Sequence, residues 1–128
     1  MTGYVSNILE ETLKNSFFRK VLYTGKHAQL VVMCLQPQED IGMEVHYNVD
    51  QFFRIEQGSA EVIIDGAKTQ VKDDFAIIVP AGAQHNIVNT GSIELKLYTI
   101  YSPPNHPEGT IHKDKKEAEE AEKLGNSA

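Results

Sequence analysis

One stretch of the chain, from Pro80 to Asn89, has the residue types and the order needed to present a single reactive side chain. An apolar, β-favouring run over 75–79 leads into Pro80, which cannot donate to a sheet ladder and therefore ends a strand. Gly82 can adopt the positive φ that a tight reversal needs. A new strand then begins at His85. The stretch therefore places one imidazole, a group that can bind a metal ion, beside an apolar interior.

A second group of polar side chains lies upstream, on two further expected strands. Glu44 and His46 are two residues apart in an extended segment over 41–46, so they share one face. Gln51 lies on the next strand, over 50–56, and shares one face of it with Phe53 and Ile55, which are both apolar. We therefore expect Gln51 to point inward with the core.

The spacing Pro-x-Gly-x-x-His-x-x-x-Asn over 80–89 resembles the second motif of the cupin superfamily, with Asp74 in place of the usual glycine six residues before the proline. A first cupin motif fits upstream, because Gly58 matches its final glycine and the usual fifteen residues, 59–73, follow it. Gln38 stands where that motif normally opens on a glycine. The resemblance implies an all-β cupin fold, a double-stranded β-helix or jelly-roll barrel. In general appearance the chain is similar to small single-domain bacterial cupins and to the cupin part of mannose-6-phosphate isomerases.

In the frame of this resemblance, four side chains form a candidate metal site at one end of the barrel. His46 and His85 match histidines of the two motifs, whereas Glu44 replaces a histidine and Gln51 replaces a glutamate. An unpaired carboxylate inside an apolar barrel is costly, so Glu44 needs a cation or a set of hydrogen bonds. These ligands would hold one divalent ion (iron, manganese, nickel, zinc or cobalt) with coordination positions left for water.

The alternative interpretation of these residues is a cupin that has lost its metal. Glu44 would then pair with a histidine or a water cluster, and Gln51 would only form hydrogen bonds. Phe53, Tyr98 and Tyr101 could line a pocket near the site, although aromatic residues on strands are more often core residues.

Three histidines lie outside the two motifs. His106 and His112 belong to a proline-rich tail, and we expect them to be surface or packing residues, although either could approach the barrel mouth. His27 lies beside an expected hairpin turn and should be solvated.

The elements that must position these residues are short strands with regular turns, as in an antiparallel sandwich or barrel. We expect strands over 18–23, 27–35, 41–46, 50–56, 60–64, 68–71, 75–79, 85–89 and 93–101. Helical spacing predicts a helix over 5–16, capped by Ser6 or Asn7. A charged helix over 113–124 has almost no apolar face, so it should fray or lie loosely on the surface. The barrel core is expected over about 17–102, within a single domain of residues 1–128.

Composition narrows the classes of protein that are possible. The net charge of −6 makes a nucleic-acid surface unexpected. No apolar stretch reaches membrane-spanning length and no signal peptide opens the chain, so a cytoplasmic protein without membrane contact is the default. Cys34 is the only cysteine, which excludes an internal disulfide and predicts a buried structural thiol.

These observations predict a metal-binding cupin that binds or transforms a small polar organic molecule. The metal would activate oxygen in a dioxygenase-like reaction, or polarise a substrate oxygen in isomerase- or lyase-like chemistry. The contrasting class is a non-catalytic binding or sensing module, with or without metal. In its favour, the chain offers few candidate acids or bases beyond the proposed ligands.

A homodimer is also expected, because a small barrel leaves a sheet edge and a sheet face that symmetric pairing can cover. A barrel of this size should have little interior left for the apolar residues of its first two strands, and the interface should bury ~2,000 Å² or more. Single-domain cupins commonly pair in this way, which the resemblance adds. The residues expected at the interface are Phe17, Phe18, Val21, Leu22, Leu30, Val32 and Cys34.

Overall fold

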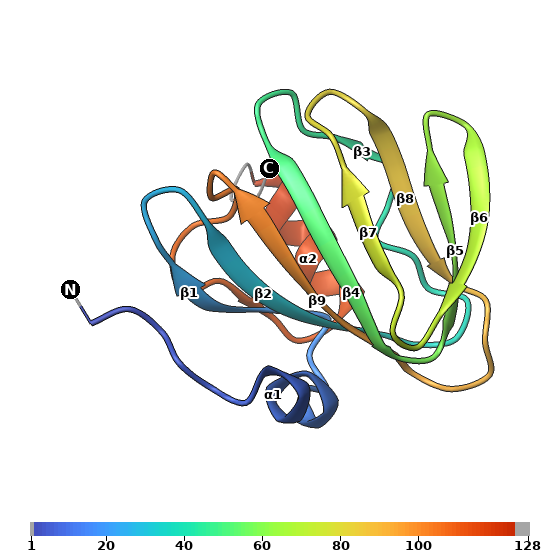
Figure 1. Ribbon diagram of the computed structural model, residues 1–128, viewed down its shortest axis with the longest axis horizontal. Coiled ribbons are helices and arrows are strands. Elements are labelled where there is room, and N and C mark those ends of the chain that lie inside the picture. Colours follow the sequence, from blue (N-terminus) through green and yellow to red (C-terminus); the bar gives the residue numbers. More distant parts are fainter. Residues whose placement is uncertain (1, 125–128) are drawn as a thin grey trace.

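The computed structural model describes residues 2–124. Its elements in chain order are α1 (Ile8–Lys14), β1 (Arg19–Thr24), β2 (Gln29–Leu35), β3 (Glu44–Val45), β4 (Asp50–Gln57), β5 (Ser59–Ile64), β6 (Ala67–Lys72), β7 (Ala76–Val79), β8 (Gln84–Asn89), β9 (Leu95–Ser102), β10 (Ile111–His112) and α2 (Lys115–Lys123). The strands form a six-stranded sheet of order β10-β1-β2-β9-β4-β7 and a four-stranded sheet of order β3-β8-β5-β6, all antiparallel (Figure 1). The all-β fold with short terminal helices is therefore confirmed.

Two strands differ from those expected. The predicted strand over 41–46 is reduced to the two residues of β3, because Gly42 has a φ of 92° and interrupts the extended backbone. The structure also contains β10, which pairs with the start of β1 so that His112 lies opposite Arg19. A strand of two residues is too short to produce an alternating pattern, so the sequence carries no signal for it.

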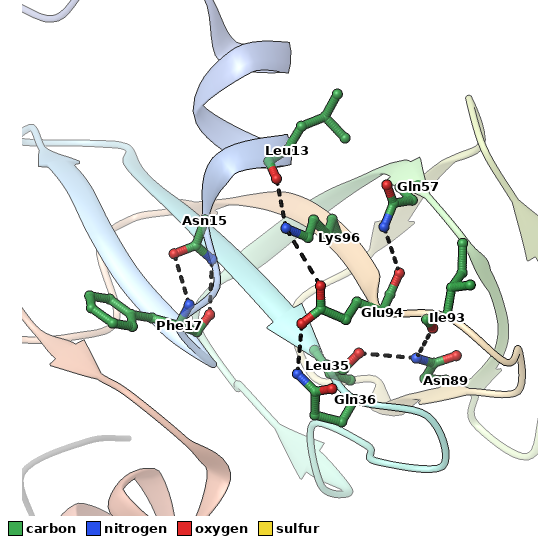
Figure 2. A network of polar contacts seen from close by, with 10 residues as sticks. All are labelled: Leu13, Asn15, Phe17, Leu35, Gln36, Gln57, Asn89, Ile93, Glu94 and Lys96. Atoms are coloured by element: carbon green, nitrogen blue, oxygen red, sulfur yellow. Dashed lines mark hydrogen bonds and ion pairs between the residues drawn. The ribbon is translucent and has the colours of Figure 1, made fainter.

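The N-terminal helix, α1, is shorter than the expected helix over 5–16. It begins directly after Asn7, which is one of the two N-cap residues that the sequence predicted. The side chain of Asn7 accepts a hydrogen bond from the backbone N–H of Glu10 at 3.1 Å. At the other end, the ammonium group of Lys96 on β9 donates to the carbonyl oxygen of Leu13 at 2.6 Å (Figure 2). This bond attaches α1 to the outer side of the six-stranded sheet. Leu9 remains 48% exposed, so the apolar side of α1 is only partly covered.

The prediction that the C-terminal helix lies loosely on the surface is wrong. Ala118 is 6% exposed and belongs to the core cluster, because its small side chain lets α2 approach the barrel closely. Lys115 forms an ion pair with Asp40, and Asp114 caps the helix by accepting from the N–H of Glu117. Among residues 2–124, no helix is long and apolar enough to cross a membrane.

The barrel core draws on both sheets and includes residues that the sequence suggested for a dimer interface. Phe53, Ile55 and Ile87 are fully buried at its centre. Phe18 and Val21 belong to this core, at 3% and 9% exposure, so the expected shortage of interior space is wrong for them. Val32 and Cys34 are also buried, at 1% and 2% exposure, but they alternate with the core residues of β2 and lie outside this cluster.

Cys34 is the buried structural thiol that was predicted. Burial raises its pKa to about 12, with the nearby Glu94 carboxylate adding to the effect. Because the thiolate is the reactive form of cysteine, this side chain is inert at neutral pH.

The asparagine that ends the second cupin motif has a structural function. Asn89 has no exposed surface, and its amide nitrogen donates to the carbonyl oxygens of Leu35 and Ile93 at 3.0 and 2.9 Å (Figure 2). Its amide oxygen accepts from the N–H of Gly91 at 2.9 Å. One side chain therefore joins the end of β2 to the loop between β8 and β9.

Gln38 and Asp74, which replace two motif glycines, both keep the backbone conformation that favours glycine. Their φ angles are 72° and 74°. Asp74 donates its N–H to the carbonyl oxygen of Ile55 at 2.8 Å, and its carboxylate lies 3.1 Å from Arg54. The fold therefore still requires a left-handed residue at both places, at a cost of about 1 kcal/mol or more for a side chain with a Cβ.

Replacing Gln38 by glycine should raise the free energy of unfolding. The exposed Gln38 side chain forms none of the hydrogen bonds found among the described residues, so Gln38→Gly relieves the left-handed strain without removing a contact. Glycine loses more conformational entropy on folding than glutamine does, and this offsets part of the gain. We therefore expect the free energy of unfolding, measured by urea denaturation, to rise by up to about 1 kcal/mol. Gly66→Ala is the opposite control, because Gly66 has a φ of 83° and should lose about 1 kcal/mol on substitution. A loss of stability in Gln38→Gly would contradict this account.

Candidate metal centre

Three of the four predicted ligands meet inside the barrel. Glu44 lies on β3 and His85 on β8, and these residues stand opposite each other in the strand pairing. His46 follows β3 and returns to the same side as Glu44. The ligand atoms of the three side chains all lie within 4.8 Å of one another. His46 and His85 are buried, at 8% and 1% exposure.

The turn before β8 connects the two motifs directly. Gly82 has a φ of 88° and donates its N–H to the carbonyl oxygen of His46 at 2.9 Å. Ala83 donates to the carbonyl oxygen of Pro80 at 3.1 Å, which closes the turn. The turn that was predicted to present His85 therefore also holds the backbone of His46.

The ring of His85 is oriented for metal binding through Nε2. Its Nδ1 lies 3.2 Å from the carbonyl oxygen of Ala83, an acceptor, so Nδ1 carries the proton and Nε2 keeps a free lone pair. Nε2 is buried and has no hydrogen-bond partner among the described residues. Burial lowers the pKa of His85, and the neighbouring His46 lowers it further, against opposing effects of Ala83 and Glu44. The neutral imidazole that a metal requires is thus the favoured form.

Glu44 and His46 face each other at close range. Oε2 of Glu44 lies 2.8 Å from Nε2 of His46, but the two atoms lack the alignment of a hydrogen bond. The rings of His46 and His85 are 5.4 Å apart between centroids. Two imidazole nitrogens and a carboxylate oxygen that converge without mutual hydrogen bonds are a donor set that fits a divalent cation.

Gln51 is buried beside this group, with its amide held in one orientation. Its nitrogen donates to the hydroxyl of Thr99 at 3.0 Å, so its oxygen is directed elsewhere. That oxygen is buried and has no partner among residues 2–124. A direct bond from Gln51 to a metal stays a prediction.

The aromatic pocket candidates occupy different faces of the sheet. Tyr101 lies 6.0 Å from His46 and Phe53 lies 6.3 Å from His85, measured between ring centroids. Both are buried. Tyr98 points to the opposite face of β9, where its ring lies 6.1 Å from that of Phe52. Phe53 and Tyr101 therefore form part of the wall of the site, and Tyr98 does not.

His106 and His112 are buried in the interior, at 5% and 6% exposure. Of the two positions expected for them, the surface is therefore wrong and the packed interior is confirmed. Nε2 of His106 lies 3.1 Å from the hydroxyl oxygen of Tyr101, and His112 lies 3.1 Å from a terminal nitrogen of Arg19. The buried side chain of Gln29 fixes the backbone of this segment, since its oxygen accepts from the N–H of His106 and its nitrogen donates to the carbonyl oxygen of His106. The sequence could not show this, because the crossing segment has no periodic pattern.

Burial favours the neutral forms of Tyr101, His106 and His112. It raises the pKa of Tyr101 to about 12, while the positive charge of Arg19 acts against the rise. Burial lowers the pKa of His106 to about 3, and the positive charge of Arg19 adds to the effect. The pKa of His112 is lowered for the same two reasons. At neutral pH the interior therefore contains an uncharged tyrosine beside uncharged histidines.

An antiparallel barrel with a histidine and carboxylate cluster at one end defines the class of this protein. The cupin domain family matches the sequence over residues 31–101, and the chain belongs to this family. Protein YrkC of Bacillus subtilis (strain 168) is 52% identical over 125 residues, which are 93% of this chain and 67% of that protein.

Two further similarities differ in extent. The crystal structure of BH2720 from Bacillus halodurans has a TM-score of 0.92 to this chain and 45% sequence identity, and the match covers 94% of this chain and 96% of that one. Mannose-1-phosphate guanylyltransferase of Escherichia coli (strain K12) is 28% identical over 78 residues, which are 61% of this chain but only 16% of that enzyme. The predicted cupin fold is confirmed.

The low pKa of His106 predicts that acid destabilises the fold. Below its ordinary pKa of 6.5 the unfolded chain takes up a proton that the folded protein refuses until about pH 3, so stability is full above pH 6.5 and falls as the pH drops through this window. Between pH 8 and pH 5 the wild type should lose roughly 2 kcal/mol more than His106→Gln, measured by urea denaturation.

The control for this prediction is His27→Gln. His27 is exposed, so its replacement should leave the dependence of stability on pH unchanged. Equal slopes for wild type and His106→Gln would show that His106 takes up its proton as readily in the folded state as in the unfolded state.

Proposed function

We propose that this cupin binds one divalent metal ion through Glu44, His46 and His85, and that it binds or transforms a small polar organic molecule there. The observation that carries the proposal is the convergence of three donors, of which the two Nε2 atoms have no hydrogen-bond partner in the described part of the chain. Buried polar atoms are normally paired, and the exceptions call for an explanation. A bound cation would satisfy both nitrogens and neutralise the carboxylate in one step.

The surrounding residues suit this chemistry. Ala83 keeps the Nε2 lone pair of His85 free, and the bond from the Gln51 nitrogen to Thr99 leaves the amide oxygen of Gln51 available as a fourth, neutral ligand. A metal bound here would supply Lewis acidity or oxygen activation. Phe53 and Tyr101 exclude water from one side, while the 21% exposure of the Glu44 side chain leaves a route from outside.

The alternative is a non-catalytic binding or sensing role, which would use the same cavity with or without a metal. The two roles differ in the fate of the ligand, because a sensor returns it unchanged. Incubation of the metal-loaded protein with a panel of small hydroxy, oxo and carboxylic compounds, followed by mass spectrometry, distinguishes turnover from binding alone.

The metal site predicts that two histidine substitutions abolish ion binding without unfolding the chain. His46→Ala combined with His85→Ala should weaken the binding of manganese, iron, nickel or zinc by more than about 100-fold in calorimetric titration. Circular dichroism should still report a folded barrel, since the core lies mainly in Phe53, Ile55 and Ile87. A wild-type protein that binds none of these ions, by titration and by elemental analysis, contradicts the proposal.

Gln51→Glu gives the matched variant at the fourth position. A carboxylate binds a divalent cation more strongly than a neutral amide, so this change should tighten metal binding if residue 51 is a ligand. Equal affinities would place Gln51 outside the coordination shell and leave the three-residue site intact.

The proposal includes a homodimer, formed through the outer side of the six-stranded sheet. β7 is an end strand of this sheet, and Ile78 on it is 68% exposed beside the half-buried Phe52. The apolar side of α1 lies on the outer side of the same sheet, with Leu9 and Leu13 partly exposed. Exposed apolar groups and an open sheet edge are features that pairing between chains covers.

Light scattering tests the dimer. The wild type should have twice the 14.3 kDa mass of the chain, and Ile78→Glu should shift it toward the monomer. Ile111→Glu is the control, because Ile111 is also exposed, at 46%, but lies on β10 at the other end of the sheet. A wild-type mass of 14.3 kDa that does not rise with concentration would rule out the dimer.

A further inference from the structure

The barrel interior contains an arginine that forms no ion pair with a carboxylate among residues 2–124. Arg19 lies on β1 with only 5% of its surface exposed. One terminal nitrogen of its guanidinium lies 3.1 Å from Nδ1 of His112, and the group stacks 5.3 Å from the ring centroid of Phe18. Its Nε is buried and has no hydrogen-bond partner among the described residues.

The other basic groups that are held within the fold are paired differently. Lys115 forms an ion pair with Asp40, and Arg54 lies between the carboxylates of Glu56 and Asp74. Within residues 2–124, no carboxylate forms an ion pair with Arg19. Arginine keeps its proton at every pH at which proteins fold, and a buried charge without a counter-ion is expensive. Arg19 is therefore suited to an anion from outside the chain.

The position of Arg19 connects it with the metal centre. A cavity of about 80 Å³ is lined by Arg19 and Glu44, with Ile41 and Ala118 among its walls. This volume is large enough for several water molecules or for a group of the size of a carboxylate. The charges of Arg19 and Glu44 both act on the buried Tyr101, because Arg19 lowers its pKa and Glu44 raises it.

The charged residues around the cavity favour a ligand with one negative charge over a ligand with two. Glu44 lines it from the metal side, and the exposed Glu119 and Glu122 of α2 line its outer rim. These carboxylates would repel a phosphate dianion, and Lys115, the other cation in the lining, is already paired with Asp40. A guanidinium presents parallel N–H donors that match the two oxygens of a carboxylate.

We propose that the ligand of this cupin is a small organic carboxylate whose anionic group is bound by Arg19, with its other polar group directed toward Glu44, His46 and His85. This inference rests on the proposed function in taking the cavity as the place where a small polar molecule binds. It adds the chemical class of the ligand and makes Arg19 the residue that selects for it.

The test compares a carboxylate with its neutral amide on the full chain. Acetate, pyruvate and lactate are titrated against acetamide, pyruvamide and lactamide, with inorganic phosphate as the dianion, in the presence of EDTA and again with zinc. The wild type should prefer at least one carboxylate over its amide by ten-fold or more in both conditions. In Arg19→Met this preference should fall to near one, while zinc affinity stays within two-fold of the wild type. Arg54→Met, which removes a half-buried arginine paired with Glu56 and Asp74, should keep the preference.

Two outcomes would overturn the inference. One is a wild type without any preference for a carboxylate over its amide, and the other is a preference that survives in Arg19→Met. The proposed metal site is tested by a different measurement, the binding of zinc to the wild type. The carboxylate preference in EDTA does not depend on zinc, so either proposal can fail without the other.

Thermal unfolding provides a second readout if Arg19→Met proves hard to purify. The preferred carboxylate should raise the melting temperature of the wild type but not that of Arg19→Met. Without ligand, Arg19→Met should melt no lower than the wild type, because it removes a buried charge that has no counter-ion. Arg19→Lys, which keeps the charge but not the paired donors, should retain the preference with weaker binding. A strong loss of stability in Arg19→Met, with an unchanged ligand response in Arg19→Lys, would show a purely structural arginine.

Discussion

The pairing of β3 with β8 is the constraint on which the site depends. It sets Glu44 opposite His85, and the bond from the Gly82 N–H to the His46 carbonyl oxygen holds the next residue on that side in place. Side chains alternate along a strand, so a slip of one residue would turn Glu44 away from the barrel interior. Both strands are short at this point, and the positive φ of Gly82 is what allows the chain to return in register.

The barrel interior is divided into an apolar region and a polar region with different consequences for stability. Phe53, Ile55 and Ile87 are fully buried and favour folding through the removal of apolar surface from water. The polar region contains several buried atoms without hydrogen-bond partners among the described residues. These atoms include Nε2 of His46 and His85, Oε1 of Gln51, Nδ1 of His106 and Nε of Arg19. Unpaired polar atoms reduce stability, and the two imidazole nitrogens that converge with Glu44 are characteristic of a site that a ligand completes.

The segments after β9 close this polar region. Gln29 fixes the backbone at His106, and His106 in turn contacts the hydroxyl of Tyr101. α2 adds a wall through Ala118 and is held by the ion pair between Lys115 and Asp40. Residues far from the two cupin motifs in the chain therefore shape the cavity beside them.

The sequence by itself determined most of the strands, the two motifs and the inward direction of Glu44, His46 and His85, because alternation and turn residues are local properties of the chain. It did not show that Arg19, His106 and His112 enter the same interior. Those residues are brought in by β1, a crossing segment and a two-residue strand, whose placement depends on long-range pairing. The burial of Ala118 and the ion pair of Lys115 were likewise decided by the tertiary structure, since a helix with so few apolar residues packs only where the barrel provides a matching surface.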